Sequence, residues 1–320
     1  MGHYNTDMFR ILAAIGLVCG LASGQIPEST RMLLEYDPAA PLNLTEKVVE
    51  QPSQSARISE IEYDSPRGGR VTGYLIQPRS AGRFAGIVFG HWGEGNRTEF
   101  IAEAIRYARA GAVSVLIDYP WVRPEPWRRK IYTAESSAEQ DRDGMAQAVV
   151  DLRRAIDLLL MRADVDPKRL AYIGHSYGAQ FGAILSAVDR RMTTSVLMAG
   201  IPGSAALWFD SNDPDEVDLR KTAGIDALKR ELEVTGVLDA IRFVPSAAPI
   251  PLLFQFAQFD RFSIDSMRAY AEAATGPKQV LWYPTGHALN DPQALTDRAN
   301  WLEQKIGLHG AIRAVSTLRR

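Results

Sequence analysis

Short apolar runs alternate with amphipathic stretches along most of the chain from residue 57 onward. Arg57–Tyr63 and Val71–Gln77 alternate or carry β-branched residues around a Pro-Arg-Gly-Gly turn, which predicts an antiparallel pair of strands. The later runs are almost wholly apolar, as is typical of strands covered on both faces. These predicted strands are Phe84–Gly90, Val113–Asp118, Leu170–Gly174, Thr194–Ala199, Leu252–Ala257 and Gln279–Tyr283.

Helical patterns separate these strands. The longest, Ala138–Arg162, carries an apolar stripe at helical spacing that includes Met145, Val149 and Leu152. Strands that alternate with helices predict an α/β fold, here an about eight-stranded, mostly parallel sheet with helices on both faces. Residues 201–246 interrupt the alternation and predict a helical, lid-like insert after the sixth strand. The other predicted helices are Glu99–Ala110, Gly178–Val188, Ile264–Ala274 and Pro292–Ile306.

The regular pattern spans residues 57–307, which we interpret as one α/β domain. Residues 25–56 contain four prolines and show no clear period, so they predict an irregular N-terminal arm. Residues 308–320 are expected to be a C-terminal tail.

The first 24 residues resemble a signal peptide. The apolar run Ile11–Ala22 follows Arg10 and precedes small residues, and it is shorter than the roughly 20 residues that span a bilayer. We therefore expect an exported protein, periplasmic or secreted, cleaved near Gly24, with no stable membrane span in its mature form. A buried N-terminal helix and a lipid anchor on Cys19 are the alternatives.

Composition excludes several classes of function. The formal net charge is −2 at pH 7, without the basic excess that nucleic-acid binding requires. The five His residues are scattered and only one Cys is present, so we expect no metal and no cofactor.

The strongest chemical signal is the pentapeptide Gly174-His175-Ser176-Tyr177-Gly178, placed between an apolar strand and a run of small residues. A nucleophilic Ser sits on a sharp strand-to-helix turn, and flanking glycines leave room for that turn to pack. We therefore predict Ser176 as a nucleophile and interpret His175 as the variable position of the motif.

A Ser hydroxyl becomes nucleophilic when a neighbouring base takes its proton and an acid orients that base. Asp260 follows the strand Leu252–Ala257, and His287 follows the strand Gln279–Tyr283. Both lie at carboxyl ends of predicted strands, where open α/β sheets place their sites. We predict His287 as the base and Asp260 as the acid, with Asp265 and Asp291 as possible substitutes for the acid.

Acyl transfer also needs hydrogen-bond donors for the oxyanion of the tetrahedral intermediate. One predicted donor is the backbone N–H of Tyr177, just after the nucleophile. The other is expected from the loop that begins His91-Trp92-Gly93, where either Trp92 or Gly93 could supply the N–H. His91 is expected to organise this loop rather than to act as a base.

The substrate pocket is the least determined part of the site. The segment 119–130 is aromatic, Pro-stiffened and basic, and could attract an acidic substrate or place solvated cations on the surface. The insert could cover the acyl site or simply pack on the sheet. His91, Trp121 and Trp208 are the candidate substrate-binding residues.

These motifs together resemble the α/β-hydrolase superfamily, and most closely its dienelactone-hydrolase and acetyl-esterase-like branches. The resemblance covers about residues 57–307 and depends on the 91–95 loop, the Ser176 pentapeptide and the ordered Asp260 and His287. It implies a serine hydrolase that cleaves small-molecule carboxylic esters through an acyl-enzyme. A peptidase of the prolyl-oligopeptidase type, an acyltransferase and a non-catalytic binding protein are the competing hypotheses.

Overall fold

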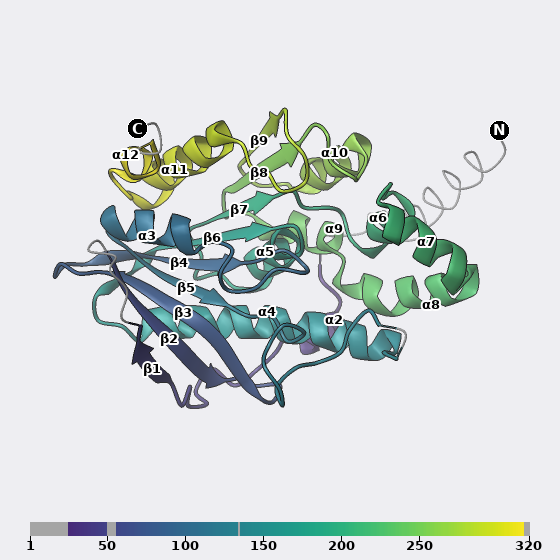
Figure 1. The fold of residues 1–320 in the computed structure, drawn as a ribbon, viewed down its shortest axis with the longest axis horizontal. Helices are drawn as coiled ribbons and strands as arrows, with labels where there is room; N and C mark the ends of the chain where they lie inside the picture. The colour runs from purple at the N-terminus through teal and green to yellow at the C-terminus, as the bar shows by residue number, and fades with distance from the viewer. Residues whose placement is uncertain (1–24, 50–55, 134, 317–320) are drawn as a thin grey trace.

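A nine-stranded sheet forms the centre of the protein, seen in a computed structural model that describes residues 25–49, 56–133 and 135–316 (Figure 1). The strand order is β1-β2-β3-β5-β4-β6-β7-β8-β9. The strands are β1 (Thr45–Val48), β2 (Ala56–Asp64), β3 (Arg70–Pro78), β4 (Phe84–Gly90), β5 (Ala112–Ile117), β6 (Val165–His175), β7 (Thr194–Met198), β8 (Leu252–Ala257) and β9 (Lys278–Tyr283).

The pairing changes from antiparallel to parallel along the sheet. β1, β2, β3 and β5 pair antiparallel, whereas β5, β4, β6, β7, β8 and β9 pair parallel. The predicted mostly parallel sheet is therefore confirmed, with β1 as an additional edge strand. Because β1 adds one strand, the helical insert follows β7, the seventh strand along the chain.

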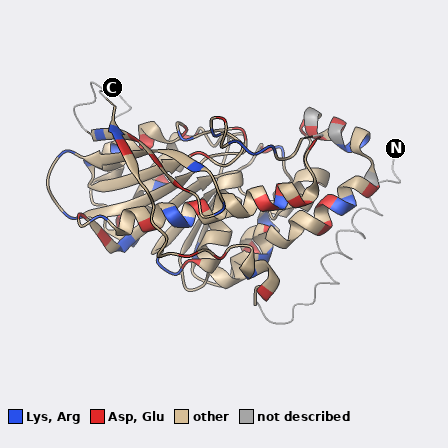
Figure 2. Ribbon diagram, turned by 90° about the horizontal axis from the view of Figure 1, so that it is seen from below, with Lys and Arg blue, Asp and Glu red and all other residues tan. Residues whose placement is uncertain are grey.

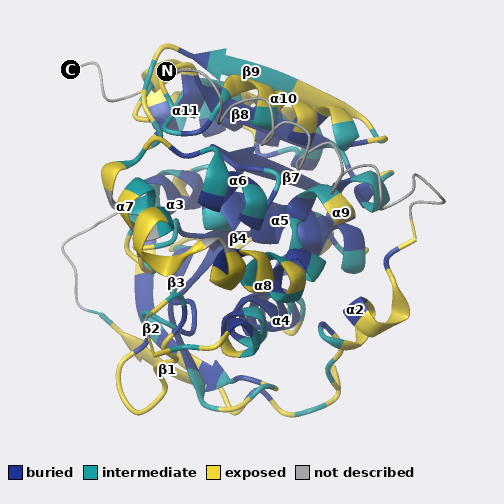
Figure 3. Ribbon diagram, turned by 90° about the vertical axis from the view of Figure 1, so that its right-hand side faces the viewer, coloured by how far each residue is buried: buried dark blue, intermediate teal, exposed yellow. Residues whose placement is uncertain are grey.

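Helices cover both faces of the sheet (Figure 1). Side chains of α4, α5 and α10 pack in one core cluster, and those of α3, α11 and α12 pack in the other. The central strands β4, β5, β7 and β8 are buried along their whole length, and dark-blue ribbons lie at the centre of Figure 3. These helices are α3 (Ile101–Arg109), α4 (Ala138–Leu160), α5 (Tyr177–Val188), α10 (Ile264–Ala273), α11 (Pro292–Ile306) and α12 (Ala311–Ser316).

The insert extends beyond the sheet and carries much exposed surface (Figures 1 and 3). Leu207 and Trp208 of the insert form a third apolar cluster with Leu228 and with Phe262 from the loop after β8. The insert therefore packs against the loops at the carboxyl ends of the strands. Its elements are α6 (Ser204–Phe209), α7 (Pro214–Ala223), α8 (Ile225–Thr235), η1 (Gly236–Leu238), α9 (Ala240–Phe243) and η2 (Val244–Ala247).

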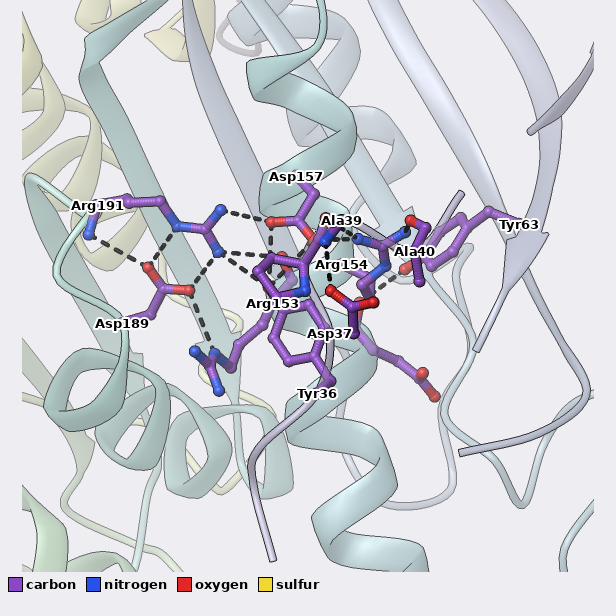
Figure 4. Close-up of polar contacts among 12 residues, drawn as sticks. Tyr36, Asp37, Ala39, Ala40, Tyr63, Arg153, Arg154, Asp157, Asp189 and Arg191 are labelled. Carbon is purple, nitrogen blue, oxygen red and sulfur yellow. Dashed lines mark hydrogen bonds and ion pairs between the residues drawn. The ribbon is translucent and has the colours of Figure 1, made fainter. Parts of the chain in front are cut away.

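The N-terminal arm is more ordered than its sequence pattern indicates. It contains α2 (Glu28–Met32) and β1. Polar and charged side chains of the arm and of α4 contact one another (Figure 4). Tyr36 of the arm donates to Asp157 of α4, and Arg153 and Arg154 lie over its ring. This packing ties the arm to the domain.

The C-terminal tail is likewise helical over α12, whose Ala311 and Val315 are buried against the core.

Acidic and basic residues are interspersed over the helices seen in Figure 2, in keeping with a net charge near zero. Within the described residues, no helix is long and apolar enough to cross a membrane. The segment predicted as a signal peptide, residues 1–24, lies outside the described residues.

Candidate active site

Ser176 occupies a strained turn between β6 and α5. Its backbone has φ 55° and ψ −112°, a conformation that L-residues with side chains rarely adopt. The turn is tight because a Cβ on Gly174 would lie 2.3 Å from the carbonyl oxygen of Gly178, and one on Gly178 would lie 2.2 Å from that of Gly90. The two glycines therefore allow the approach that presents the Ser176 side chain at the end of the sheet.

The three residues predicted for the hydrolytic chemistry lie in one hydrogen-bonded chain. His287 Nε2 is 2.9 Å from Ser176 Oγ, and His287 Nδ1 is 2.9 and 3.0 Å from the two carboxylate oxygens of Asp260. A carboxylate only accepts, so Nδ1 carries the proton and Nε2 is free to accept from the hydroxyl. This tautomer is the one that a general base toward Ser176 requires.

Burial sets the electrostatics of the base. The Asp260 side chain is fully buried, and that of His287 is 15% exposed. Desolvation lowers the pKa of His287 below its usual 6.5, and the hydrogen bond and charge of Asp260 offset part of that fall. The imidazole is therefore neutral, and able to accept a proton, at neutral pH.

The two substitute acids lie elsewhere. Asp265 is in the first turn of α10 with an 87% exposed side chain, and it faces Arg268. The side chain of Asp291 caps α11 by accepting from the Gln293 backbone N–H. Among the three candidate acids, Asp260 alone is hydrogen-bonded to His287 in the described structure.

The loop after β4 is held at several backbone groups. His91 Nε2 accepts from the Tyr119 N–H, so its Nδ1 donates to the Trp92 carbonyl, 2.6 Å away. The Trp92 N–H donates to Glu99 at 2.8 Å, and the Gly93 carbonyl accepts from the Trp121 indole at 2.7 Å. His91 thus organises the loop, and burial lowers its pKa to about 3, which keeps it neutral.

This bonding distinguishes the two loop amides. The Trp92 N–H is already engaged by Glu99. The Gly93 N–H and the Tyr177 N–H have no hydrogen-bond partner among the described residues. A trans peptide directs its N–H opposite to its C=O. Because the Trp92 carbonyl is fixed by His91 and by the Gly95 N–H, the direction of the Gly93 N–H is fixed as well.

Sequence reasoning missed Glu99 and misread His175. His175 is hydrogen-bonded on both ring nitrogens, to Glu99 at 2.6 Å and to the backbone carbonyl of His287 at 2.8 Å. It is therefore more than the variable position of its motif. Glu99 resembles an ordinary acidic residue near a helix start, and only the tertiary structure brings it to His175.

A cavity of about 310 Å³ lies beside Tyr177 and Gly93. Trp121 and Trp208, both predicted to bind substrate, line it, whereas His91 is not part of the lining. Insert residues form one wall, so the insert contributes to the cavity as well as packing on the domain. The remaining lining residues are Trp92, Glu94, Ile131, Tyr132, Leu207, Glu216 and Arg261.

The basic segment 119–130 was expected either to attract an acidic substrate or to place solvated cations on the surface, and not all of its residues fit one of these two roles. Trp121 lies in the cavity wall, but Arg123 is completely buried and forms an ion pair with buried Asp151 at 2.5 Å.

Among the described residues, no cluster of three or more His, Cys, Asp or Glu side chains is arranged to hold a metal ion.

Comparison with solved structures identifies the architecture. An acetyl xylan esterase from Paenibacillus sp. R4 superposes with a TM-score of 0.71 at 20% identity, covering 87% of this chain and 92% of that one. Acetyl xylan esterase 1 from Thermoanaerobacterium sp. JW/SL YS485 gives a TM-score of 0.70 at 15% identity over 90% of this chain and 96% of that one. The chain has the α/β-hydrolase fold.

A further solved structure superposes less closely. A cold-adapted esterase from an Arctic intertidal metagenomic library gives a TM-score of 0.60 at 16% identity, covering 83% of this chain and 100% of that one. No protein-family model matches the sequence, and a search of curated proteins finds no match. At these identities the likeness establishes the fold, and the function has to be argued from the site.

Proposed function

We propose that this α/β-hydrolase cleaves carboxylic esters through an acyl-enzyme formed on Ser176. The observation that carries the proposal is the hydrogen-bonded chain from Ser176 Oγ through His287 to buried Asp260. A hydroxyl bonded to a neutral imidazole, itself held by a carboxylate, is the arrangement that makes Ser nucleophilic. The esterases among the similar structures are consistent with this chemistry.

In the proposed reaction, Ser176 Oγ attacks the ester carbonyl carbon while His287 Nε2 takes the hydroxyl proton. The oxyanion accepts hydrogen bonds from the backbone N–H groups of Tyr177 and Gly93. Gly93, rather than Trp92, is the second donor because the Trp92 N–H already donates to Glu99. The C–O bond then breaks, and His287 returns its proton to the leaving alcohol. A water molecule, deprotonated by His287, then attacks the acyl carbon, the bond to Ser176 Oγ breaks to release the carboxylic acid, and His287 returns the proton to Ser176.

We propose that the esters carry short acyl chains. Two of the similar structures are acetyl xylan esterases, and bulky Trp121 and Trp208 form part of the wall of the cavity beside Tyr177. The wild type should therefore turn over p-nitrophenyl acetate and butyrate faster than octanoate. A preference for octanoate would contradict a short-chain pocket.

The test of the catalytic proposal compares wild type with Ser176→Ala on these substrates, together with labelling by a fluorophosphonate. We expect activity and labelling in the wild type and neither in the variant. Activity retained by Ser176→Ala would overturn the proposal.

We also propose that the protein is exported, on the evidence of the sequence pattern of residues 1–24. Mass spectrometry of the full-length chain expressed in a bacterial host should give a mature N-terminus near Gln25. An intact N-terminus at Met1, or at Met8 if translation begins there, would contradict export by signal-peptide cleavage.

A further inference from the structure

The side chains of Glu99 and His175, which are not among the three predicted hydrolytic residues, connect the loop after β4 with the loop that carries His287. Glu99 accepts from the Trp92 N–H through Oε2, at 2.8 Å, and binds His175 Nδ1 through Oε1, at 2.6 Å. The other ring nitrogen of His175 lies 2.8 Å from the backbone carbonyl oxygen of His287. Glu99 and His175 thus bridge the loop after β4 and the loop that carries the base.

The partners of His175 determine its protonation. A backbone carbonyl can only accept a hydrogen bond, and so can an ionised carboxylate. When Glu99 is ionised, both contacts are hydrogen bonds only if each nitrogen of His175 carries an N–H, as in an imidazolium. His91 provides the contrast within the same site, because one of its nitrogens accepts from the Tyr119 N–H and its ring is therefore neutral.

We propose that Glu99 and His175 form a buried ion pair that positions the oxyanion loop and His287 relative to Ser176. The inference rests on the proposed esterase function. Neither residue is expected to contact the reacting atoms, so both are positioning residues. Glu99 fixes the Trp92 end of the Trp92–Gly93 segment, and His175 fixes the backbone of the residue that supplies the base.

Burial makes the pair strong and its loss costly. The side chains of His175 and Glu99 are 6% and 20% exposed. A charged partner left alone in such surroundings loses its compensation, whereas the intact pair has short, charge-assisted hydrogen bonds. Replacing one member is therefore expected to change the geometry of the site and not only to remove a contact.

The pair also enters the electrostatics of the base. The rings of His175 and His287 have centroids 5.4 Å apart. The titratable and charged groups that face this pair of rings are Glu99 beside His175, Asp260 and Arg261 beside His287, and Tyr119 and Tyr172 near Glu99. The positive charge of His175 opposes protonation of His287, and Asp260 supports it.

The protonation of His175 can be observed directly. In the full-length protein labelled with ¹⁵N-histidine, a long-range ¹H–¹⁵N spectrum distinguishes protonated from unprotonated ring nitrogens. At pH 8 both nitrogens of His175 should be protonated, whereas His91 should show one of each, with assignments taken from His→Gln variants. An unprotonated nitrogen on His175 at this pH would overturn the ion pair.

The positioning role is tested with Glu99→Gln. The amide can still accept from the Trp92 N–H, but it removes the charge opposite His175. A displacement of about 1 Å near reacting groups can cost 10²-fold in rate, so we expect kcat per fluorophosphonate-titrated site to fall roughly 10- to 100-fold with little change in KM.

Glu103→Gln is the matched control. Glu103 lies in the adjoining helix α3 and forms a similarly buried ion pair with Arg298, at 2.8 Å, but it contacts no backbone of the site. We expect this variant to lose stability and to keep kcat per titrated site. If Glu99→Gln also keeps its kcat, the pair is merely structural and the proposal is wrong.

The two proposals fail in different ways. If the chain is not a serine hydrolase, fluorophosphonate labelling at Ser176 is absent while the ring-nitrogen spectrum of His175 still shows an imidazolium. If the positioning proposal alone is wrong, labelling and esterase activity persist, and either the spectrum or the kcat of Glu99→Gln contradicts it.

Discussion

Three histidines of one site differ in their hydrogen-bond partners and therefore in their chemistry. His91 is neutral because it accepts from the Tyr119 N–H and its burial disfavours charge. His287 is oriented by Asp260, so that its Nε2 can accept from Ser176. His175 lies between a carboxylate oxygen of Glu99 and the backbone carbonyl oxygen of His287, and we propose that it pairs with Glu99 as an imidazolium. The residue type alone sets none of these states.

Removing the charge of Asp260 is expected to impair catalysis severely. Asp260→Asn exchanges the carboxylate that holds the Nδ1 proton for an amide that can present an N–H to it, so the wrong tautomer of His287 is favoured. In the best-studied Ser-His-Asp triad, the same exchange lowers kcat by a factor of about 10⁴, and we expect a loss of that order here. Steady-state hydrolysis of p-nitrophenyl acetate measures it.

Asp265→Asn is the control for that experiment. Asp265 is an exposed acid five residues further along the chain, and its exposed ion pair with Arg268 contributes little. Its kcat should match the wild type. Equal losses in the two variants, or a near-normal Asp260→Asn, would assign the acid to a different residue.

The pH profile follows from the lowered pKa of His287. Because the pKa of His287 lies below 6.5, the acid limb of kcat/KM, where His287 takes a proton, should have its midpoint below pH 6.5. Kinetics between pH 4 and 8 check this. An acid limb centred above pH 6.5 would contradict a base made less basic by burial.

At the scale of elements, the apolar runs predicted most of the sheet and the long helices. β4, β8 and α11 have the predicted bounds, because each is a continuous buried run or a capped amphipathic helix. β1 could not be found in this way, since all four of its residues are exposed and carry no apolar alternation. The helix α12 was missed because it is only six residues long.

The packing of the insert on α4 includes an unfavourable acidic contact. Burial, followed by the nearby charge of Asp141, raises the pKa of Glu231 in α8 to about 7. One oxygen of this carboxyl is buried without a hydrogen-bond partner among the described residues. An ionised Glu231 therefore destabilises the contact between the two helices.

Glu231→Gln should stabilise the protein at high pH. In the unfolded chain a Glu ionises near pH 4.5, and in the fold Glu231 ionises near 7, so the wild type loses stability as pH rises through this window. Because the group is partly exposed, the gain at pH 8 is expected to be only about 1 kcal/mol, or roughly 2–4 °C in Tm. Thermal melts should show this gain at pH 8 and none at pH 4.5. An equal gain at both values would exclude titration as the cause.

At the scale of the whole molecule, the N-terminal arm belongs to the folded domain. Asp157 of α4 accepts from Tyr36 of the arm, from Arg154 of the same helix and from Arg191 of the loop before β7 (Figure 4). Arg154 in turn donates to the backbone carbonyls of Pro38 and Ala40. One carboxylate thus connects three segments that are far apart in the sequence.

Asp157→Asn should cost about 3 kcal/mol in the free energy of unfolding, because it leaves the buried guanidinium of Arg154 without its carboxylate, whereas Arg191 keeps its ion pair with Asp189. Urea denaturation measures the loss. Glu135→Gln, which breaks the exposed pair with Lys130, should change the free energy by less than about 0.5 kcal/mol. If the two variants are equally stable, the hydrogen bonds and ion pairs of Asp157 do not stabilise the packing of the arm on α4.

The limits of prediction from the sequence have one cause. Ser176, Asp260 and His287 are each marked by their place at the end of an apolar strand, so a local pattern is sufficient to find them. Glu99, His175 and the arm act through partners that are distant in the sequence, and no local pattern encodes such pairing. The contribution of the insert to the cavity wall likewise depends on tertiary packing.

The most direct measurement is the hydrolysis of p-nitrophenyl acetate by wild type and by Ser176→Ala at pH 8, with fluorophosphonate labelling of both proteins. We predict turnover and labelling in the wild type, and the loss of both in the variant. Undiminished turnover by Ser176→Ala would contradict the assignment of the nucleophile, and a wild type that neither hydrolyses nor labels would contradict the serine-hydrolase account.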